Sequence, residues 1–419
     1  FAAVSRRLLQ SWLSPAPFFA ALWVVVSAVP LLAAADEQVW PPAMWLLVLF
    51  VAAFCSAAIV AERRALAREH APEAEGRPDA TRLGGAVLAA SIVGAGAVVA
   101  LMIGQEHPAS DLLRADAWLE VSARYTMGRY QQDVDEPLAA RLLSVGFYFG
   151  AAAGGWLWVA SRRLRDRLIS ALPLVIALGH ATLTTARAVL LFALSMWVAA
   201  AFAARVVDRR PIARIRTRAI SAALIGSAGL IAVSTGLQLA RGGEGDLTTP
   251  QEAFSHLGTW LFGHLPGFGI WLRERFDGAA PLELGHRTFG GAFQLLGLAD
   301  RERGVYTDFV RLASGRETNI YTAFRGLLQD FGLGGALLAT ALAGAGSAVA
   351  YVRALRRRPG SGAALALAYA FLLWTPIVSF FSYNTLLVAF ALAAPALRIV
   401  TRREGRSDAH PAPVRALPV

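Results

Sequence analysis

AMWLLVLFVAAFCSAAIVA, residues 43–61, is the kind of stretch that decides the fold, because it carries no charged side chain along its whole length. A helix needs roughly 20 mostly apolar residues to cross a bilayer. Similar runs recur along the chain and predict spans at 17–35, 43–61, 83–103, 140–160, 169–183, 187–205, 219–239, 331–352, 362–380 and 383–398. The sequence therefore predicts an all-α polytopic integral membrane protein of about ten transmembrane helices.

The composition supports this prediction. The chain is 56% hydrophobic and 16% charged, with a mean hydropathy of +0.49, whereas ordinary soluble domains are about 25% charged. The lipid bilayer is therefore the expected surrounding medium, and we expect multi-pass insertion.

The net charge of +11 comes from arginine alone, since the chain has 40 arginines and no lysine. With the helix-end residues Arg205 and Arg398, the termini and alternate loops hold 26 arginines against 9 acidic residues, and the rest of the chain holds 14 against 20. This asymmetry is the positive-inside pattern, which places both termini in the cytoplasm. It also explains the basic charge by membrane topology, so no nucleic-acid partner is expected.

The predicted spans divide the chain into four parts. Residues 1–239 form a membrane region of seven helices, in which the first run is interpreted as a retained helix rather than a cleaved signal. Residues 240–330 form a large extracytoplasmic loop expected to bind substrate, and its aromatic stretch from Trp260 to Leu272 predicts interfacial or re-entrant helices. Residues 331–400 contribute three more helices, and 401–419 read as a disordered cytoplasmic tail.

Arginines on the outer side need a reason, because topology favours the inner side. Arg187 begins the sixth predicted helix shortly after His180, where it either snorkels to the outer headgroups or binds an anion in a groove. Arg287 lies in the glycine-rich stretch Leu284–Gly291, where the backbone can approach a ligand.

The richest cluster runs from Gly315 to Gly332, against the eighth predicted helix. If it is helical, Asn319 shares a face with Thr322, and Tyr321 with Arg325. Asp330 would then reach the membrane edge, where a structural salt bridge to Arg325 is the alternative to a role in chemistry.

Three other patterns are weaker. Asp133-Val134-Asp135 resembles a metal-binding motif but is better explained as a solvated acidic loop. Asp36-Glu37 lies in a first outer loop that is too short for a lipid-phosphosugar transferase site. His256 and His264 have no obvious third ligand, so no metal site and no cofactor are expected.

Four stretches form a further pattern when taken in order: Thr185-Ala186-Arg187 with its following leucines, residues 257–268, Leu284–Phe289, and Thr318–Thr322 leading to Asp330-Phe331-Gly332. They resemble the O-antigen polymerase family, also called oligosaccharide repeat unit polymerases, and the helix count and the large outer loop are similar too. Departures are Ala186 and Leu328, where the family often has serine and an aromatic residue. The resemblance implies a place in a bacterial cytoplasmic (inner) membrane.

The resemblance implies a glycosyltransferase that acts on the outer leaflet. It would join polyprenyl-pyrophosphate-linked (undecaprenyl-type) oligosaccharide repeats, as donor and acceptor, into a cell-envelope polysaccharide, and a chain-length regulator protein would be a possible partner. Because the leaving group is a pyrophosphate, guanidinium groups suit the charge that develops on it, without a metal.

Residue roles follow from this chemistry. Arg187, Arg287, Arg316 and Arg325 are expected to bind the pyrophosphate, and to converge on one groove open to the outer leaflet. His286, Glu317 and Asp330 are candidates for the general base that accepts the proton of the acceptor hydroxyl. Thr318, Asn319 and Tyr321 are expected to contact sugar.

The sequence leaves other functions open. An O-antigen ligase-like transferase would use the same donor with another acceptor. A flippase or transporter for lipid-linked sugars would predict internal symmetry and charges deep in several helices, neither of which the sequence shows. A non-catalytic assembly subunit would not need so many outer arginines.

Overall fold

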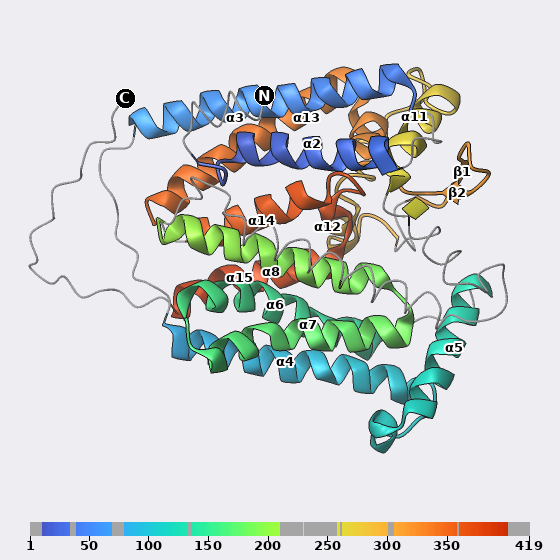
Figure 1. Cartoon of the computed structure of the whole chain (residues 1–419), viewed down its shortest axis with the longest axis vertical. Helices are drawn as coiled ribbons and strands as arrows, with labels where there is room; N and C mark the ends of the chain where they lie inside the picture. Colours follow the sequence, from blue (N-terminus) through green and yellow to red (C-terminus); the bar gives the residue numbers. More distant parts are fainter. Residues whose placement is uncertain are drawn as a thin grey trace, which may run out of the picture.

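The protein is a bundle of helices, shown by a computed structural model in Figure 1, and the structure is 78% helical. It describes residues 11–33, 39–68, 79–131, 136–209, 229, 258–259, 262–300, 306–357 and 360–400. The elements are α2 (Pro15–Ala33), α3 (Pro41–Arg68), α4 (Ala80–Ile103), η1 (Ala109–Leu113), α5 (Ala115–Gln131), α6 (Leu138–Ala160), α7 (Leu164–Thr184), α8 (Arg187–Val207), α11 (His264–Glu274), α12 (Gly290–Leu295), β1 (Val310–Arg311), β2 (Glu317–Thr318), α13 (Ala323–Leu355), α14 (Ser361–Trp374), η2 (Phe380–Ser382) and α15 (Asn384–Val400).

The described helices fit a multi-pass membrane protein. Six of them, α3, α4, α6, α7, α8 and α13, are long and apolar enough to cross a bilayer, and three shorter apolar helices lie in α2, α14 and α15. Nine predicted spans thus coincide with helices. The remaining predicted span, 219–239, lies almost wholly outside the described residues. The tail, Asp36-Glu37, Asp133–Asp135 and His256 also lie outside them.

The long helices lie side by side, with α3, α2 and α13 along one side and α4 along the other, while α5, α11 and the β1–β2 hairpin gather at one end (Figure 1). Small residues allow the close contacts. A β-carbon on Gly344 of α13 would lie 2.3 Å from the carbonyl oxygen of Phe54 in α3, and one on Gly155 of α6 would lie 2.1 Å from that of Trp197 in α8. Membrane helices pack through such positions because lipid supplies no hydrophobic drive between helices.

Arginines tie three helices together at the opposite end, where α3, α8 and α13 finish. Each donates to a carbonyl of a neighbouring helix end, which satisfies acceptors that the helix itself leaves unpaired. The bonds run from Arg356 Nη2 to Leu66 O (3.0 Å), from Arg209 Nε to Leu355 O (3.3 Å) and from Arg357 Nε to Val207 O (3.1 Å).

Helix α13 is two helices joined at Gly332. The backbone of Gly332 has φ 63° and ψ −177°, which L-residues other than glycine rarely adopt. The first piece, from Ala323 to Phe331, belongs to the end of the bundle that carries α11 and the hairpin. The second piece contains the predicted span, whose start at 331 coincides with this break.

The part of Gly315–Gly332 that precedes α13 is not helical, so the condition for the helical placements is met only from Ala323 onward. Glu317 and Thr318 form β2, which pairs antiparallel with β1, and the helix begins only at Ala323. Alternating β-branched residues at 318, 320 and 322 favour the extended form. The i, i+3 pairing of Asn319 with Thr322 therefore does not occur, whereas Tyr321 still meets Arg325 across the helix start.

The aromatic stretch of the large loop includes helix α11, which is largely buried in protein. Leu265, Phe268 and Trp271 are at most 3% exposed. Gly269 brings α11 against α3, where a β-carbon would lie 3.3 Å from Trp40 Cβ. The described part of the large loop is thus packed onto the bundle.

Replacement of Gly344 by alanine tests the α3–α13 contact. The new methyl group would meet the Phe54 carbonyl, so Gly344→Ala is expected to lower the stability by about 1–3 kcal/mol. Gly346→Ala is the matched control, because a β-carbon there meets nothing within 4 Å and alanine favours helix. Thermal unfolding in detergent should separate the two variants, and equal melting temperatures would contradict the close approach.

Candidate functional site

The loop of residues 283–288 is held to the first piece of α13 by Asp330. The Asp330 carboxylate accepts the backbone N–H of Arg287 at 3.0 Å and that of Thr288 at 2.6 Å. Further backbone bonds run from Glu283 N to Gln329 O and from Leu284 N to Asp330 O, both 3.1 Å. Asp330 is fully buried, and its carboxylate therefore holds the loop that carries Arg287 in place.

The Arg325 guanidinium is enclosed by aromatic rings although it is a charged group. Its side chain lies at the start of α13 with only 5% exposure. Its Cζ lies 4.1 Å from the ring centroid of Tyr321, 4.2 Å from that of Tyr306 and 4.9 Å from that of Trp271. Such cation–π contacts are strongest where water is excluded, so they offset part of the desolvation of Arg325.

Asp308 is the carboxylate that pairs with Arg325, rather than Asp330 as the sequence suggested. It accepts from Arg325 Nη2 at 2.8 Å and from Arg275 Nη1 at 2.9 Å. Burial raises the pKa of Asp308, but the hydrogen bond and the positive charge of Arg325 outweigh burial and hold that pKa below the usual value of an aspartate. Tyr321 donates to the Asp308 carbonyl at 2.8 Å, and burial raises the pKa of Tyr321 to about 12.

A continuous set of polar contacts joins Arg287 to Arg325. Glu283 accepts from Arg287 Nε at 2.6 Å and from Gln329 Nε2 at 3.5 Å, and Gln329 in turn accepts from Arg325 Nε at 3.2 Å. We call Arg275, Glu283, Arg287, Asp308, Arg325 and Gln329 the Arg325 network. Two of the four predicted arginines therefore belong to one arrangement, in which Arg287 is the more exposed, at 31% of its side chain.

Gly326 explains how closely the two arginines approach. A β-carbon at this position would lie 3.1 Å from Tyr306 Oη and 3.4 Å from Arg287 Cβ. The absence of a side chain one residue after Arg325 therefore lets the loop of Arg287 lie directly on the start of α13.

Arg316 lies at the turn of the β1–β2 hairpin, which also carries the predicted sugar contacts. Its Nη1 donates to Thr259 Oγ1 at 3.5 Å. Thr318 is buried, Asn319 donates to the Tyr306 carbonyl at 3.1 Å, and Tyr321 is fully buried against the Arg325 network. Of these three, only Asn319 is partly exposed.

The other two candidates for the general base are exposed. His286 lies in the same loop as Arg287, and its ring stacks on Phe293 with centroids 4.5 Å apart. Glu317 lies on β2 with its side chain outward. Asp330, in contrast, already accepts two backbone N–H groups.

Arg187 is the first residue of α8 and is 7% exposed, directly after a turn in which Thr185 has φ 51°. Helix α8 contacts η2, because the ring centroids of Phe192 and Phe380 lie 6.0 Å apart. The segment of η2 in turn holds the 283–288 loop: Ser379 Oγ donates to Thr288 O at 2.7 Å, and Ser382 Oγ donates to Arg287 O at 2.8 Å. His180, near the end of α7, is buried against Phe147.

Sequence reasoning missed Asp308, Glu283, Tyr306 and Trp271. Asp308 and Arg325 are joined only because the hairpin returns the chain to the start of α13, and no fixed spacing predicts that contact. The pairing of Glu283 with Arg287 could have been predicted from the sequence, since Glu283 precedes Arg287 by four residues.

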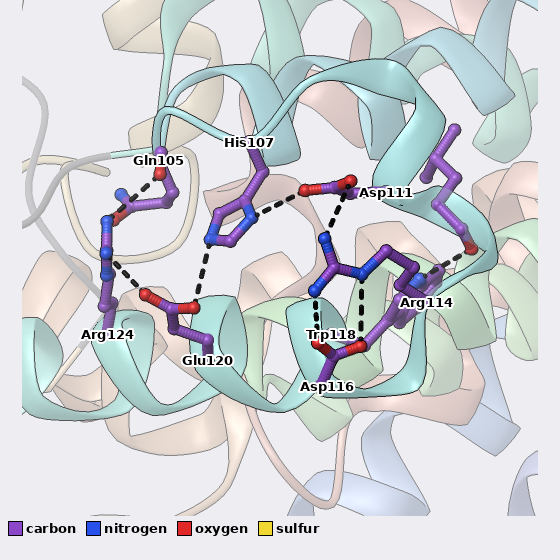
Figure 2. A network of polar contacts seen from close by, with 9 residues as sticks. Gln105, His107, Asp111, Arg114, Asp116, Trp118, Glu120 and Arg124 are labelled. Carbon is purple, nitrogen blue, oxygen red and sulfur yellow. Dashed lines mark hydrogen bonds and ion pairs between the residues drawn. The ribbon is translucent and has the colours of Figure 1, made fainter.

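A second polar cluster lies at the same end of the bundle, on η1 and α5 (Figure 2). His107 lies between Asp111, at 3.2 Å, and Glu120, at 3.6 Å, and Arg124 pairs with Glu120 at 2.6 Å. Arg114 pairs with Asp116 on the same segment. The cluster ties α5 to the end of α4.

Comparisons with protein-family models, with curated proteins and with solved structures find no match. Any function proposed for the chain therefore rests on its fold and on the geometry of its site.

Asp308→Asn tests the pairing with Arg325. The folded-state pKa of Asp308 lies below its unfolded value, so its charge stabilises the fold above about pH 4, and this contribution is lost as the pH falls through the lower folded-state value. We expect Asp308→Asn to be less stable by about 1–3 kcal/mol at pH 7, and the difference from the wild-type protein to shrink below about pH 4.

Melting temperatures of both proteins between pH 7 and pH 3 measure this effect. Asp116→Asn is the control, because Asp116 is also paired with an arginine but on an exposed surface, where ion pairs contribute little. Equal stability of the two variants at pH 7 would contradict the role assigned to Asp308.

Proposed function

We propose that the protein is a membrane glycosyltransferase that polymerises polyprenyl-pyrophosphate-linked oligosaccharide repeats on the outer leaflet. The observation that carries this proposal is the continuous set of polar contacts that joins Arg287 to Arg325 through Glu283 and Gln329, at one end of a helical bundle. Guanidinium groups held in a partly dry site stabilise charge that builds on a departing pyrophosphate.

In the proposed reaction, a hydroxyl oxygen of the acceptor repeat attacks the anomeric carbon of the donor sugar. The bond from that carbon to the pyrophosphate oxygen breaks, and polyprenyl pyrophosphate leaves with the electron pair. The hydroxyl proton passes to a general base. The products are a lengthened saccharide on the acceptor lipid and a free lipid pyrophosphate.

The arginines divide into two roles. Arg287 is partly exposed and pairs with the carboxylate of Glu283, which is itself partly exposed, so a phosphate oxygen can take the place of Glu283; Arg316 on the hairpin is the second contact. Arg325 is enclosed by three rings and Asp308, so it acts as a positioning residue that fixes the site and contributes positive potential. Arg187, at the start of α8, lies outside the Arg325 network, and its part in phosphate binding stays a prediction from the sequence.

His286 is the base that this geometry favours among the three candidates. It is exposed and lies beside Arg287 in the chain, and histidine is the side chain that most often acts as a general base. Asp330 is better explained as the anchor of the loop. Asn319 remains the accessible sugar contact.

The proposal includes ten spans and an outer-face site, and two contacts of the described residues support it. Arg209 lies beside Leu355, at the end of α13, and Thr259 lies beside Arg316 and the hairpin, at the start of α13. The chain between Arg209 and Thr259 therefore has to cover the length of α13, roughly 50 Å at 1.5 Å per residue, and the apolar run 219–239 is long enough to be proposed as a span. With an even number of spans both termini lie on one side, which the positive-inside pattern makes the cytoplasm.

Arg287→Ala is the variant that tests the proposal. In cells that make the polysaccharide, we expect the polymer ladder to be lost while single repeats persist, because removal of one charge-stabilising donor costs roughly a hundredfold or more in rate. Gel analysis of the surface glycan reads out the result, after membrane levels of the variant are shown to be normal.

Arg124→Ala provides the matched control, since Arg124 also pairs with a glutamate four residues earlier at 2.6 Å. It should leave the ladder intact. An intact ladder with Arg287→Ala would contradict the mechanism. A different outcome would identify a ligase-like transferase, which shares the donor. In that case Arg287→Ala would still assemble the ladder on the lipid carrier, but the polymer would not be transferred to its final acceptor.

A further inference from the structure

A groove of about 620 Å³ opens between α3 and α13, away from the Arg325 network. Its floor is made of small and apolar side chains, among them Ala57, Val60, Ala61 and Val349, and its lining includes Arg64 and Arg68. This volume lies within the range of sites that hold small molecules.

Two contacts define the ends of the groove. On one side, Gly344 brings α13 onto the backbone of Phe54, so the helices touch there. On the other side, Arg356 bridges to the carbonyl of Leu66 at 3.0 Å. Between these points the α3 lining consists mostly of small side chains.

The groove faces outward from the described bundle. Helices α3 and α13 are the least enclosed of the six long apolar helices, with 33% and 28% of their apolar windows buried, and α3 forms an edge of the bundle (Figure 1). Val60 is 47% exposed. In a membrane, such a surface is in contact with acyl chains.

Charge is concentrated at one end of this apolar surface. Arg64 and Arg68 are one helical turn apart and exposed, and Arg353 follows Val349 by one turn on α13. Within the described part of α3 the one acid is Glu62, which points elsewhere, because it is 2% exposed and accepts from Ser14 Oγ at 2.6 Å. The described lining of the groove contains arginines and no carboxylate.

We propose that the α3–α13 groove is a binding site for an anionic glycerophospholipid. One acyl chain lies along Ala57, Ala61 and Val349, and the headgroup phosphate is held by Arg64 and Arg68, which bind phosphate oxygens through their paired N–H groups. Basic pockets between membrane helices on the cytoplasmic side suit acidic lipids, and this end of α3 is cytoplasmic in the proposed topology. Lipid binding here is independent of the proposed reaction.

The arginine-rich segment after Arg209 is a poorer occupant for the same groove. The chain leaves the described bundle at Arg209, beside the finish of α13, and the next residues include Arg210, Arg214, Arg216 and Arg218. Four more positive charges would be repelled by Arg64 and Arg68, whereas a phosphate is attracted. Charge complementarity therefore favours lipid.

Native mass spectrometry of the purified full-length chain tests the site. The protein is titrated with dioleoyl-phosphatidylglycerol, and with dioleoyl-phosphatidylcholine as the lipid without net charge. We expect Arg64→Ala/Arg68→Ala to weaken binding of the first phosphatidylglycerol roughly tenfold or more and to leave phosphatidylcholine binding unchanged.

Arg63→Ala/Arg165→Ala is the matched control, because it removes the same charge from exposed arginines outside the groove lining. It should retain the preference for phosphatidylglycerol. Equal losses in both double variants, or no loss in either, would overturn the proposal.

Two further tests ask whether the groove holds a lipid acyl chain or residues of the protein itself. Ala61→Phe fills the groove and keeps the arginines, so it should weaken binding of both lipids; unchanged binding would contradict the acyl-chain placement. In a Cys55→Ala background, Val60→Cys and Leu224→Cys should not form a disulfide. An efficient disulfide would show that residues near 224 fill the groove and would overturn the proposal.

Discussion

Burial of the Arg325 guanidinium is the constraint on which the end of the bundle that carries α11 and the hairpin depends. A cation with 5% exposure is costly unless its contacts replace water. The replacements come from separate segments: Trp271 from α11, Tyr306 and Asp308 from the segment before β1, and Gln329 from α13. Satisfying this one side chain therefore fixes α11, the β1–β2 hairpin and the start of α13 relative to one another.

The break at Gly332 gives this arrangement its place on the membrane bundle. It separates a short, buried helix that carries Arg325 and Asp330 from the long apolar helix after it. Asp330, two residues before the break, holds the backbone of the loop that presents Arg287. The result is a rigid, buried arginine beside a partly exposed one whose carboxylate partner is exchangeable. That division suits transient binding of a pyrophosphate, since the fixed group provides potential and the exchangeable group provides contact.

The sequence was sufficient for the parts of the fold that depend on local hydrophobicity. Apolar runs located nine helices, and the start of the eighth predicted span at 331 coincides with Gly332. The side-chain placements expected within Gly315–Gly332 depended on a helix, but Thr318, Ile320 and Thr322 favour the extended backbone seen before Ala323. For the site, Arg287 and Arg325 were predicted and lie in one network. The pairing of Asp308 with Arg325 was not predictable, because it depends on how the hairpin folds back. The hydrogen bonds of Asp330 were not predictable either, because its partners are backbone N–H groups, which every residue other than proline has.

Binding of a lipid diphosphate by the arginines at this end of the bundle is the property on which the proposed enzyme depends. Isothermal titration of the purified protein with farnesyl pyrophosphate, with farnesyl monophosphate as comparison, measures it without the need for a full substrate. We expect the pyrophosphate to bind more tightly than the monophosphate, and Arg287→Ala to lose this preference while Arg124→Ala keeps it. Equal affinity for both lipids, or an undiminished preference in Arg287→Ala, would contradict the assignment of these arginines to the diphosphate.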